Sequence, residues 1–147
     1  MTQEEKQLLL KDLCARLPYG IIINTGDEDL KLDRQHQGIG VLYPEDCSDE
    51  FNKRNNNASF YITISGCYYG EEIKPYLRPL SSMTEKEIGK YKCLNDALDE
   101  NYEVHIDNAY PAFDWLNANH FDYRGLISKG LALEAPKDMY NLNENKL

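Results

Sequence analysis

The strongest constraint on the fold is an alternation of side chains between residues 60 and 65. Phe60, Ile62 and Ile64 occupy every second position, and hydroxyl-bearing residues fill the positions between them. Because successive side chains of a β-strand point to opposite faces, this pattern predicts a strand with one buried and one wet face. Shorter apolar or alternating runs predict further strands in the same half of the chain. These runs are residues 20–24, 30–33, 38–43 and 73–77.

Two prolines limit what residues 73–77 can do. Pro75 and Pro79 lack a backbone N–H donor, so we expect this stretch to be an edge strand or an extended segment. Residues 102–107 predict one more short strand. Residues 45–57 are polar and end in three asparagines, which predicts a long mobile loop between two strands.

Two capping boxes mark the starts of helices. Thr2 with Glu5, and Thr84 with Glu87, have the spacing in which each side chain accepts a hydrogen bond from the other residue's backbone N–H. Apolar residues at three- and four-residue spacing behind each box predict buried stripes. The expected stripes are Leu9, Leu10, Leu13, Cys14 and Leu17 in the first helix, and Ile88, Tyr91, Leu94 and Leu98 in the second.

The C-terminal third predicts two more helices. Residues 109–119 form one, with Phe113 and Leu116 facing inward, and Asp122 caps a short one that ends near Gly130. We therefore expect an α+β fold with an N-terminal helix, an antiparallel meander sheet of about four or five strands, and C-terminal helices packed on one face. Residues 1–136 form a single domain in this interpretation, and residues 137–147 form a polar C-terminal tail.

The charge balance narrows the class of partner. The chain carries 25 acidic and 16 basic side chains, a formal net charge of −9, without any basic run. Nucleic-acid affinity is built from Lys and Arg contacts to phosphates, so direct nucleic-acid binding is disfavoured. An acidic surface can instead bind a basic surface of another protein, although solubility alone also explains a negative charge. The 11 tyrosines suit positions that are partly buried and partly exposed to solvent. Such positions occur both in a protein interface and at the rim of the core.

The cysteines and the apolar runs predict the compartment. Cys14, Cys47, Cys67 and Cys93 form no CxxC pair and no zinc-ribbon spacing, so we expect reduced and mostly buried thiols. The longest apolar runs are only a few residues, which predicts no membrane span and no membrane partner. We therefore expect a cytoplasmic protein that uses no cofactor.

Two stretches carry a resemblance to a known group of proteins. Residues 73–85 (IKPYLRPLSSMTE) and 114–140 (DWLNANHFDYRGLISKGLALEAPKDMY) resemble segments of uncharacterised small proteins encoded in phages, prophages and other mobile elements of gut bacteria. The resemblance implies a mobile-element origin and the cytoplasm of a bacterial host cell. It brings no activity and no catalytic residue.

The proline-containing stretch from 74 to 79 has the composition of a binding surface. Proline reduces the entropy that is lost on docking, and Tyr76 and Arg78 are side-chain types favoured at interface hot spots. Trp115 and Tyr123 are the other candidate anchors. In the alternative interpretation the stretch is a connector held to the core by its apolar residues, and Trp115 packs in the core. The residues alone leave both interpretations open.

Histidines and carboxylates of the C-terminal third give an alternative kind of site. His105, Asp107, His120 and Asp122 are residue types that bind divalent metals, and a metal held by them can activate water for hydrolysis. Their spacing is not that of a metal-binding helix, and Asp107 and Asp122 are equally suited to cap helices while His120 packs at a helix end. The chain has no GxSxG elbow and no dinucleotide-binding glycine pattern.

Three functions from different classes follow from these observations. The first is a mobile-element-encoded binding or accessory protein, an adaptor or inhibitor, that contacts another protein through an acidic, tyrosine-rich face. The second is a small metal-assisted hydrolase, and the third is a structural or assembly component of a phage particle. We favour the first, because the chain lacks every specific catalytic motif while its charge and aromatic residues suit an interface.

Overall fold

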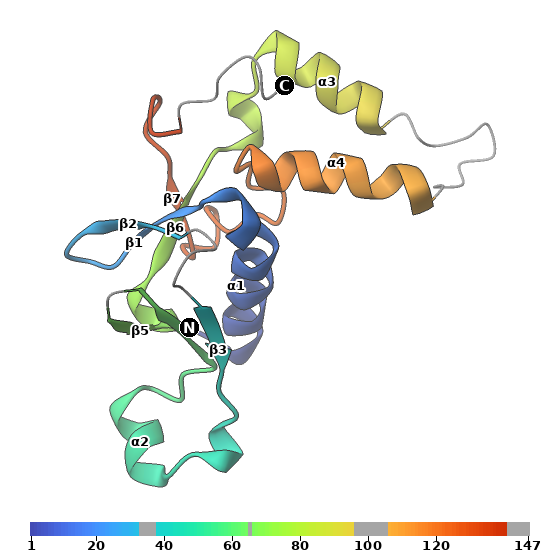
Figure 1. Cartoon of the computed structure of the whole chain (residues 1–147). Coiled ribbons are helices and arrows are strands. Elements are labelled where there is room, and N and C mark those ends of the chain that lie inside the picture. The colour runs from blue at the N-terminus through green and yellow to red at the C-terminus, as the bar shows by residue number, and fades with distance from the viewer. Residues whose placement is uncertain (33–37, 65, 96–105, 141–147) are drawn as a thin grey trace.

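The computed structural model describes residues 1–32, 38–64, 66–95 and 106–140 (Figure 1). Helices and strands both occur in these residues, which confirms the α+β class. The α-helices are α1 (Gln3–Arg16), α2 (Asp49–Arg54), α3 (Glu85–Asn95) and α4 (Ile106–Ala118). The strands are β1 (Ile22–Asn24), β2 (Asp29–Lys31), β3 (Gly38–Val41), β4 (Phe60–Thr63), β5 (Cys67–Tyr69), β6 (Lys74–Leu77) and β7 (Leu133–Glu134). Short 3₁₀ helices are η1 (Leu17–Tyr19), η2 (Pro44–Asp46), η3 (Gly70–Glu72) and η4 (Leu80–Ser82).

The described strands form two sheets rather than the single meander expected. One sheet has the order β2-β1-β6-β7, and the other has the order β3-β4-β5. All neighbouring strands are antiparallel except β6 and β7, which run parallel. Alternation of side chains shows which residues are in a strand but not which strand is its neighbour, so the sequence pattern could not separate the two sheets.

The position of β6 corrects the expectation of an edge strand. It lies between β1 and β7, although it contains Pro75. Its two neighbours contact different halves of it, because Lys74 and Pro75 pair with β1 whereas Tyr76 and Leu77 pair with β7. The proline therefore has a strand on one side only, and its missing N–H donor is tolerated within a central strand.

Two clusters of buried residues hold the fold together. The larger one joins the leucines of α1 to apolar residues of both sheets and of the segment after α4, with Leu9, Leu13 and Phe60 fully buried. The smaller one lies between α3 and α4, around Trp115 and Phe121. In Figure 1, α3 and α4 lie side by side at one end of the molecule, and α2 lies at the opposite end.

Both capping boxes are confirmed, but three of the expected inward residues face solvent. Cys14 is exposed, Ile88 is 40% exposed and Phe113 is 51% exposed. Helix α4 buries the neighbouring stripe that includes Ala112, and α3 buries Glu87 one position before Ile88. The expected inward residue Leu116 is buried, and Tyr91 and Leu94 pack against the same cluster, so the predicted stripes are correct except at Cys14, Ile88 and Phe113. Leu98 lies outside the described residues.

Three segments differ from the predicted secondary structure. Residues 45–57 contain α2, whose first turn is capped by Ser48 Oγ accepting from Phe51 N at 3.1 Å, so the expectation of an uninterrupted loop is wrong, while its mobility stays a prediction. Ile106 begins α4, so the strand predicted for residues 102–107 is wrong at its end, and residues 102–105 lie outside the described part. The short helix expected after Asp122 is a series of turns that closes at Gly130, whose φ of 72° is left-handed.

The segment after Pro136 contributes a side chain to the fold. Tyr140 donates a hydrogen bond to Tyr76 O at 2.7 Å and accepts one from Ile22 N at 3.1 Å. Its ring stacks on His120 with 3.9 Å between the ring centroids. Burial raises the pKa of Tyr140, so the phenol is the neutral donor that this geometry requires. The part of the predicted tail up to Tyr140 is therefore held against β1 and β6.

The thiols lie nearer the surface than expected. Cys14, Cys67 and Cys93 are exposed, Cys47 is half-buried, and all four are free. The expectation of mostly buried thiols is therefore wrong. Within the described residues, no helix combines the length and the apolar character needed to cross a membrane.

Candidate protein-binding surface

The structure places Arg78, one of the predicted binding residues, in an ion pair between elements. Its guanidinium donates to both carboxylate oxygens of Glu87, with Nη2 to Oε1 at 2.8 Å and Nη1 to Oε2 at 2.9 Å. The guanidinium also lies 4.1 Å from the ring centroid of Phe121. The Arg78 side chain is 17% exposed and that of Glu87 is 4% exposed. Arg78 therefore links the end of β6 to α3 and to the segment after α4.

The other three predicted binding residues lie in different surroundings. Trp115 is 8% exposed and stacks on Phe121 at 5.6 Å between ring centroids, which places it in the smaller core cluster. Tyr123 packs against that cluster and lies 4.5 Å beneath the guanidinium of Arg124. Tyr76 is half-buried on the four-stranded sheet and accepts a hydrogen bond from Asn24 Nδ2 at 3.5 Å. Arg78 and Trp115 thus meet at Phe121, whereas Tyr76 belongs to another part of the surface.

The Glu87 carboxylate gives this region a measurable pH dependence. Burial raises the pKa of Glu87, but hydrogen bonds from Arg78 and Thr84 lower it by more, so the folded pKa lies below the usual 4.5. The ionised Glu87 carboxylate therefore contributes its full stabilisation of the fold above pH 4.5. This contribution is lost as the pH falls through the pKa that Glu87 has in the folded protein. We expect Glu87→Gln to reduce the slope of unfolding free energy against pH below 4.5, measured by urea unfolding. The exposed Glu85→Gln is the control, and equal slopes in all three proteins would contradict the assignment.

The residues predicted as alternative metal ligands do not form a site within the described residues. Asp122 is occupied by the backbone, since its two carboxylate oxygens accept from Leu126 N and Ile127 N at 2.8 and 2.9 Å. His120 is 4% exposed and stacks on Tyr140. Asp107 lies in the first turn of α4, and His105 lies outside the described residues. In the described ranges, no group of three or more His, Cys, Asp or Glu could hold a metal ion.

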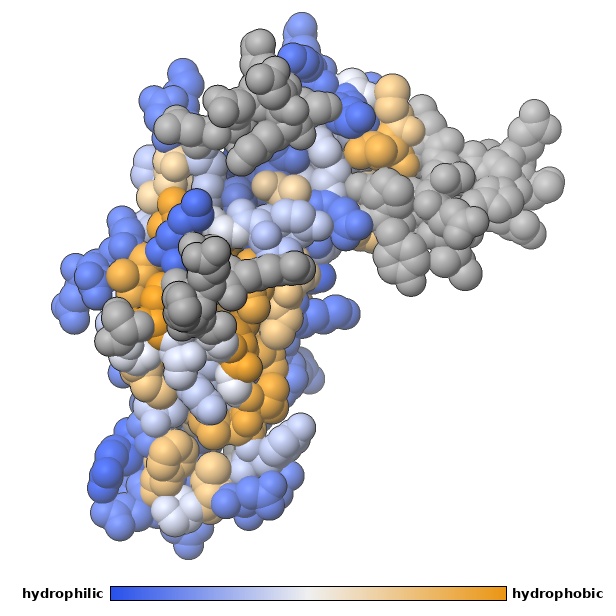
Figure 2. Space-filling view, in the orientation of Figure 1, coloured by the Kyte–Doolittle hydropathy of each residue, from blue (hydrophilic) through white to orange (hydrophobic). Residues whose placement is uncertain are grey.

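A surface that the sequence analysis did not single out lies along β3. Ile39, Val41 and Tyr43 alternate along this strand and its continuation, and they become more exposed toward its end. Val41 is 49% exposed and Tyr43 is 58% exposed. Figure 2 shows hydrophobic surface gathered along β3 and the adjoining part of α1. We call the strip formed by Ile39, Val41 and Tyr43 the β3 edge.

Two residues of the β3 edge, Ile39 and Val41, direct their backbone polar groups away from β4. Leu42 N donates to Ser59 O at 2.8 Å, which makes these residues a hydrogen-bonded pair. In an antiparallel ladder, hydrogen-bonded and non-hydrogen-bonded pairs alternate, so Gly40 also bonds to β4. Ile39 and Val41 belong to the non-hydrogen-bonded pairs, so their N–H and C=O groups point away from β4, toward the open edge of the sheet. Among the described strands, β4 is the only partner of β3.

The opposite edge of the same sheet is protected. By the same alternation Cys67 and Tyr69 direct their amides away from β4, because Ile64 N donates to Gly66 O at 2.9 Å. Glu72 covers one of these two amides, since its Oε2 accepts from Tyr69 N at 2.9 Å, and the chain then turns into η3. Proteins commonly blunt edge strands in such ways to prevent unwanted pairing. In the described part of the chain, no comparable acceptor reaches Ile39 or Val41.

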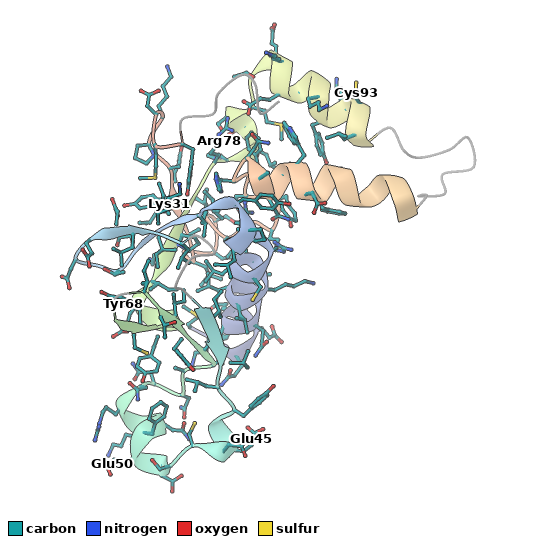
Figure 3. All side chains as sticks on the ribbon, viewed as in Figure 1. Lys31, Glu45, Glu50, Tyr68, Arg78 and Cys93 are labelled. Carbon is teal, nitrogen blue, oxygen red and sulfur yellow. The ribbon has the colours of Figure 1, made fainter. Side chains whose placement is uncertain are left out.

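Carboxylates surround the end of the β3 edge. Glu45, Asp46, Asp49 and Glu50 follow Tyr43 within η2 and α2, and all four are exposed. Figure 3 shows Glu45 and Glu50 at the end of the molecule that carries α2. Residues 38–72 hold six acidic and two basic side chains, a net charge of −4 out of −9 for the whole chain. The β3 edge is therefore an apolar and aromatic strip in a negative field.

No protein-family model, curated protein or solved structure matches this chain. The candidate surface therefore rests on geometry alone. Its sequence signal was the run GIGVLY followed directly by Pro44 and two acids. That run predicted a strand, but only the pairing with β4 showed that the strand lies at an edge.

Proposed function

We propose that this chain is a mobile-element-encoded protein-binding accessory protein, an adaptor or inhibitor, that works in the bacterial cytoplasm. Its binding surface is the β3 edge with the carboxylates that follow it, and its partner is a protein with a basic surface. Tyr43 is the central anchor. The mobile-element setting comes from the resemblance of residues 73–85 and 114–140 described above.

The observation that carries this proposal is the exposure of Val41 and Tyr43 beside exposed carboxylates and beside backbone groups that no other described strand covers. Tyrosine is enriched at interface hot spots, where it adds a large ring and a hydroxyl at low entropic cost. Acidic residues around such an anchor speed association with a basic partner and restrict the choice of partner. Arg78 and Trp115 lie outside this surface, where their contacts hold α3 and α4 in place.

Capture from host lysate with matched variants tests the proposal. Tagged protein is incubated with nuclease-treated lysate at about 0.1 M salt, where electrostatic attraction reaches about 10 Å, and captured protein is eluted at about 1 M, where it reaches about 3 Å. We expect one stoichiometric partner. Removing a hot-spot ring costs about 2 kcal/mol or more, so Tyr43→Ala is expected to weaken binding of that partner by about thirtyfold.

The controls separate this surface from others. Glu45→Lys is expected to slow association and to reduce the salt dependence, whereas Asp138→Lys, the same type of change at an exposed site near the C-terminus, leaves both unchanged. Tyr76→Ala tests the surface predicted from sequence. Loss of the partner with Tyr76→Ala but not with Tyr43→Ala would move the binding surface away from β3. Absence of any stoichiometric partner would contradict a protein-binding function.

A further inference from the structure

We infer that the β3 edge binds an extended, basic segment of its partner as an additional β-strand. This inference rests on the proposed function and specifies how the partner binds. In strand addition, backbone hydrogen bonds supply affinity and alternate side chains supply specificity. The outward N–H and C=O groups of Ile39 and Val41 are the complement that such a segment requires.

The contrast between the two edges of the sheet supports strand addition over side-chain docking alone. Both edges belong to one small sheet, and on the β5 edge the outward amide of Tyr69 donates to Glu72, whereas within the described residues no such acceptor meets the outward amides of β3. On the β3 side, Gly38 and Gly40 have no side chains. The ring of Tyr61 covers Gly40 so closely that a Cβ atom added to this glycine would lie 2.2 Å from Tyr61 Cζ. Pro44 ends the available strand. The accessible strand is therefore short.

The negative charge around the β3 edge favours a basic partner over a second copy of this chain. A second copy of the chain carries the same net charge of −9, so two copies repel each other at close approach. A partner strand that runs past Tyr43 reaches the same carboxylates, so lysines or arginines at its end would meet opposite charge. A basic segment of another protein is thus favoured over a homodimer formed through β3.

Amide hydrogen exchange with a defined peptide tests the inference. The probe is a synthetic peptide of alternating valine and lysine, and the control peptide has glutamate in place of lysine. In the free protein we expect the amides of Ile39 and Val41 to exchange faster than that of Gly40, which bonds to β4. With the lysine peptide we expect exchange at Ile39 and Val41 to slow by about tenfold or more, with no change for the glutamate peptide.

A pair of proline variants provides the matched test. Val41→Pro removes an outward N–H and no bond to β4, so the sheet is retained while affinity for the lysine peptide falls by about tenfold. Cys67→Pro removes an outward N–H from the opposite edge and leaves affinity unchanged. The wild-type exchange data give the result without either variant if one of them fails to fold.

Three results would overturn strand addition. Binding of the lysine peptide without protection of Ile39 and Val41 would show docking on the carboxylates alone, while the protein-binding function would still stand. Protection that rises with protein concentration in the absence of peptide would make a second copy the occupant. Failure of the lysine peptide to bind would contradict the inferred basic chemistry, and lysate capture would then decide separately whether the chain binds a protein at all.

Discussion

Asp12→Asn is expected to lower the free energy of unfolding by about 3–5 kcal/mol, the usual result of breaking a buried ion pair from one side. Asp12 Oδ2 accepts from Arg16 Nε, and Oδ1 accepts from Arg124 Nη1, both at 2.8 Å. The side chains of Asp12 and Arg16 are 0% exposed, so the variant leaves a guanidinium in the core without its carboxylate. Urea unfolding followed by circular dichroism measures the loss.

A second ion pair of the same spacing serves as the control. Glu50 and Arg54 are also four residues apart on a helix, with 2.9 Å between Arg54 Nη2 and Glu50 Oε1, but their side chains are 83% and 72% exposed. We expect Glu50→Gln to change the unfolding free energy by less than about 0.5 kcal/mol. Similar losses for Asp12→Asn and Glu50→Gln would show that burial does not decide the strength of the pair at Asp12.

Phe121→Ala is expected to cost about 3–5 kcal/mol of unfolding free energy, as for other large rings removed from a core. Phe121 is fully buried, stacks on Trp115 and lies beneath the guanidinium of Arg78. Its carbonyl also accepts from Arg16 Nη2 at 2.6 Å, so α1, β6 and α4 all meet at this residue. Thermal unfolding of the variant should retain a single transition if the two core clusters unfold together.

Phe113 is the matched control for Phe121. It lies on α4, is 51% exposed and contacts Tyr123 at 5.6 Å between ring centroids. We expect Phe113→Ala to cost less than about 1 kcal/mol, because little apolar surface leaves contact. Two separate transitions in Phe121→Ala, with only one of them shifted, would show instead that the α3–α4 cluster is an independent unit.

Local features of the fold were predictable from the sequence. The capping boxes at Thr2 and Thr84 are interactions across three residues, so residue types at fixed spacing are enough to identify them. The alternation around Phe60 and Ile62 likewise depends only on the geometry of one strand. These elements are correct in the structure because no distant residue is needed to define them.

Features that depend on distant residues were not predictable. Helix α2 has six residues, too short for an apolar periodicity, and only the Ser48 cap marks its start. The central place of β6 depends on β7, whose residues lie more than fifty positions later. Glu87 was expected only as a cap, whereas its burial depends on Arg78 from another element. For β6 and Glu87 the deciding contact joins segments that are distant in the sequence, whereas α2 was missed because its one local signal is a single cap.

The candidate surface shows the same limit. The run from Gly38 to Tyr43 was predicted as a strand, and the acids that follow it were part of the predicted acidic character. That Val41 and Tyr43 stay exposed follows from the place of β3 at the edge of its sheet. Tyr76, Arg78, Trp115 and Tyr123 remain predicted binding residues, and the contacts of Arg78 and Trp115 give those two side chains a role in packing.

The positions of the strands in the chain allow the two sheets to close at different stages of synthesis. Strands β3, β4 and β5 are consecutive and lie within residues 38–69, so their sheet can form as soon as that segment has emerged. The four-stranded sheet must wait for β7, and Arg16 must wait for a carbonyl that lies 105 residues later. A nascent chain can therefore present β3 to its surroundings before its own core is complete, and the partner that we propose for this strand could then meet the protein during translation.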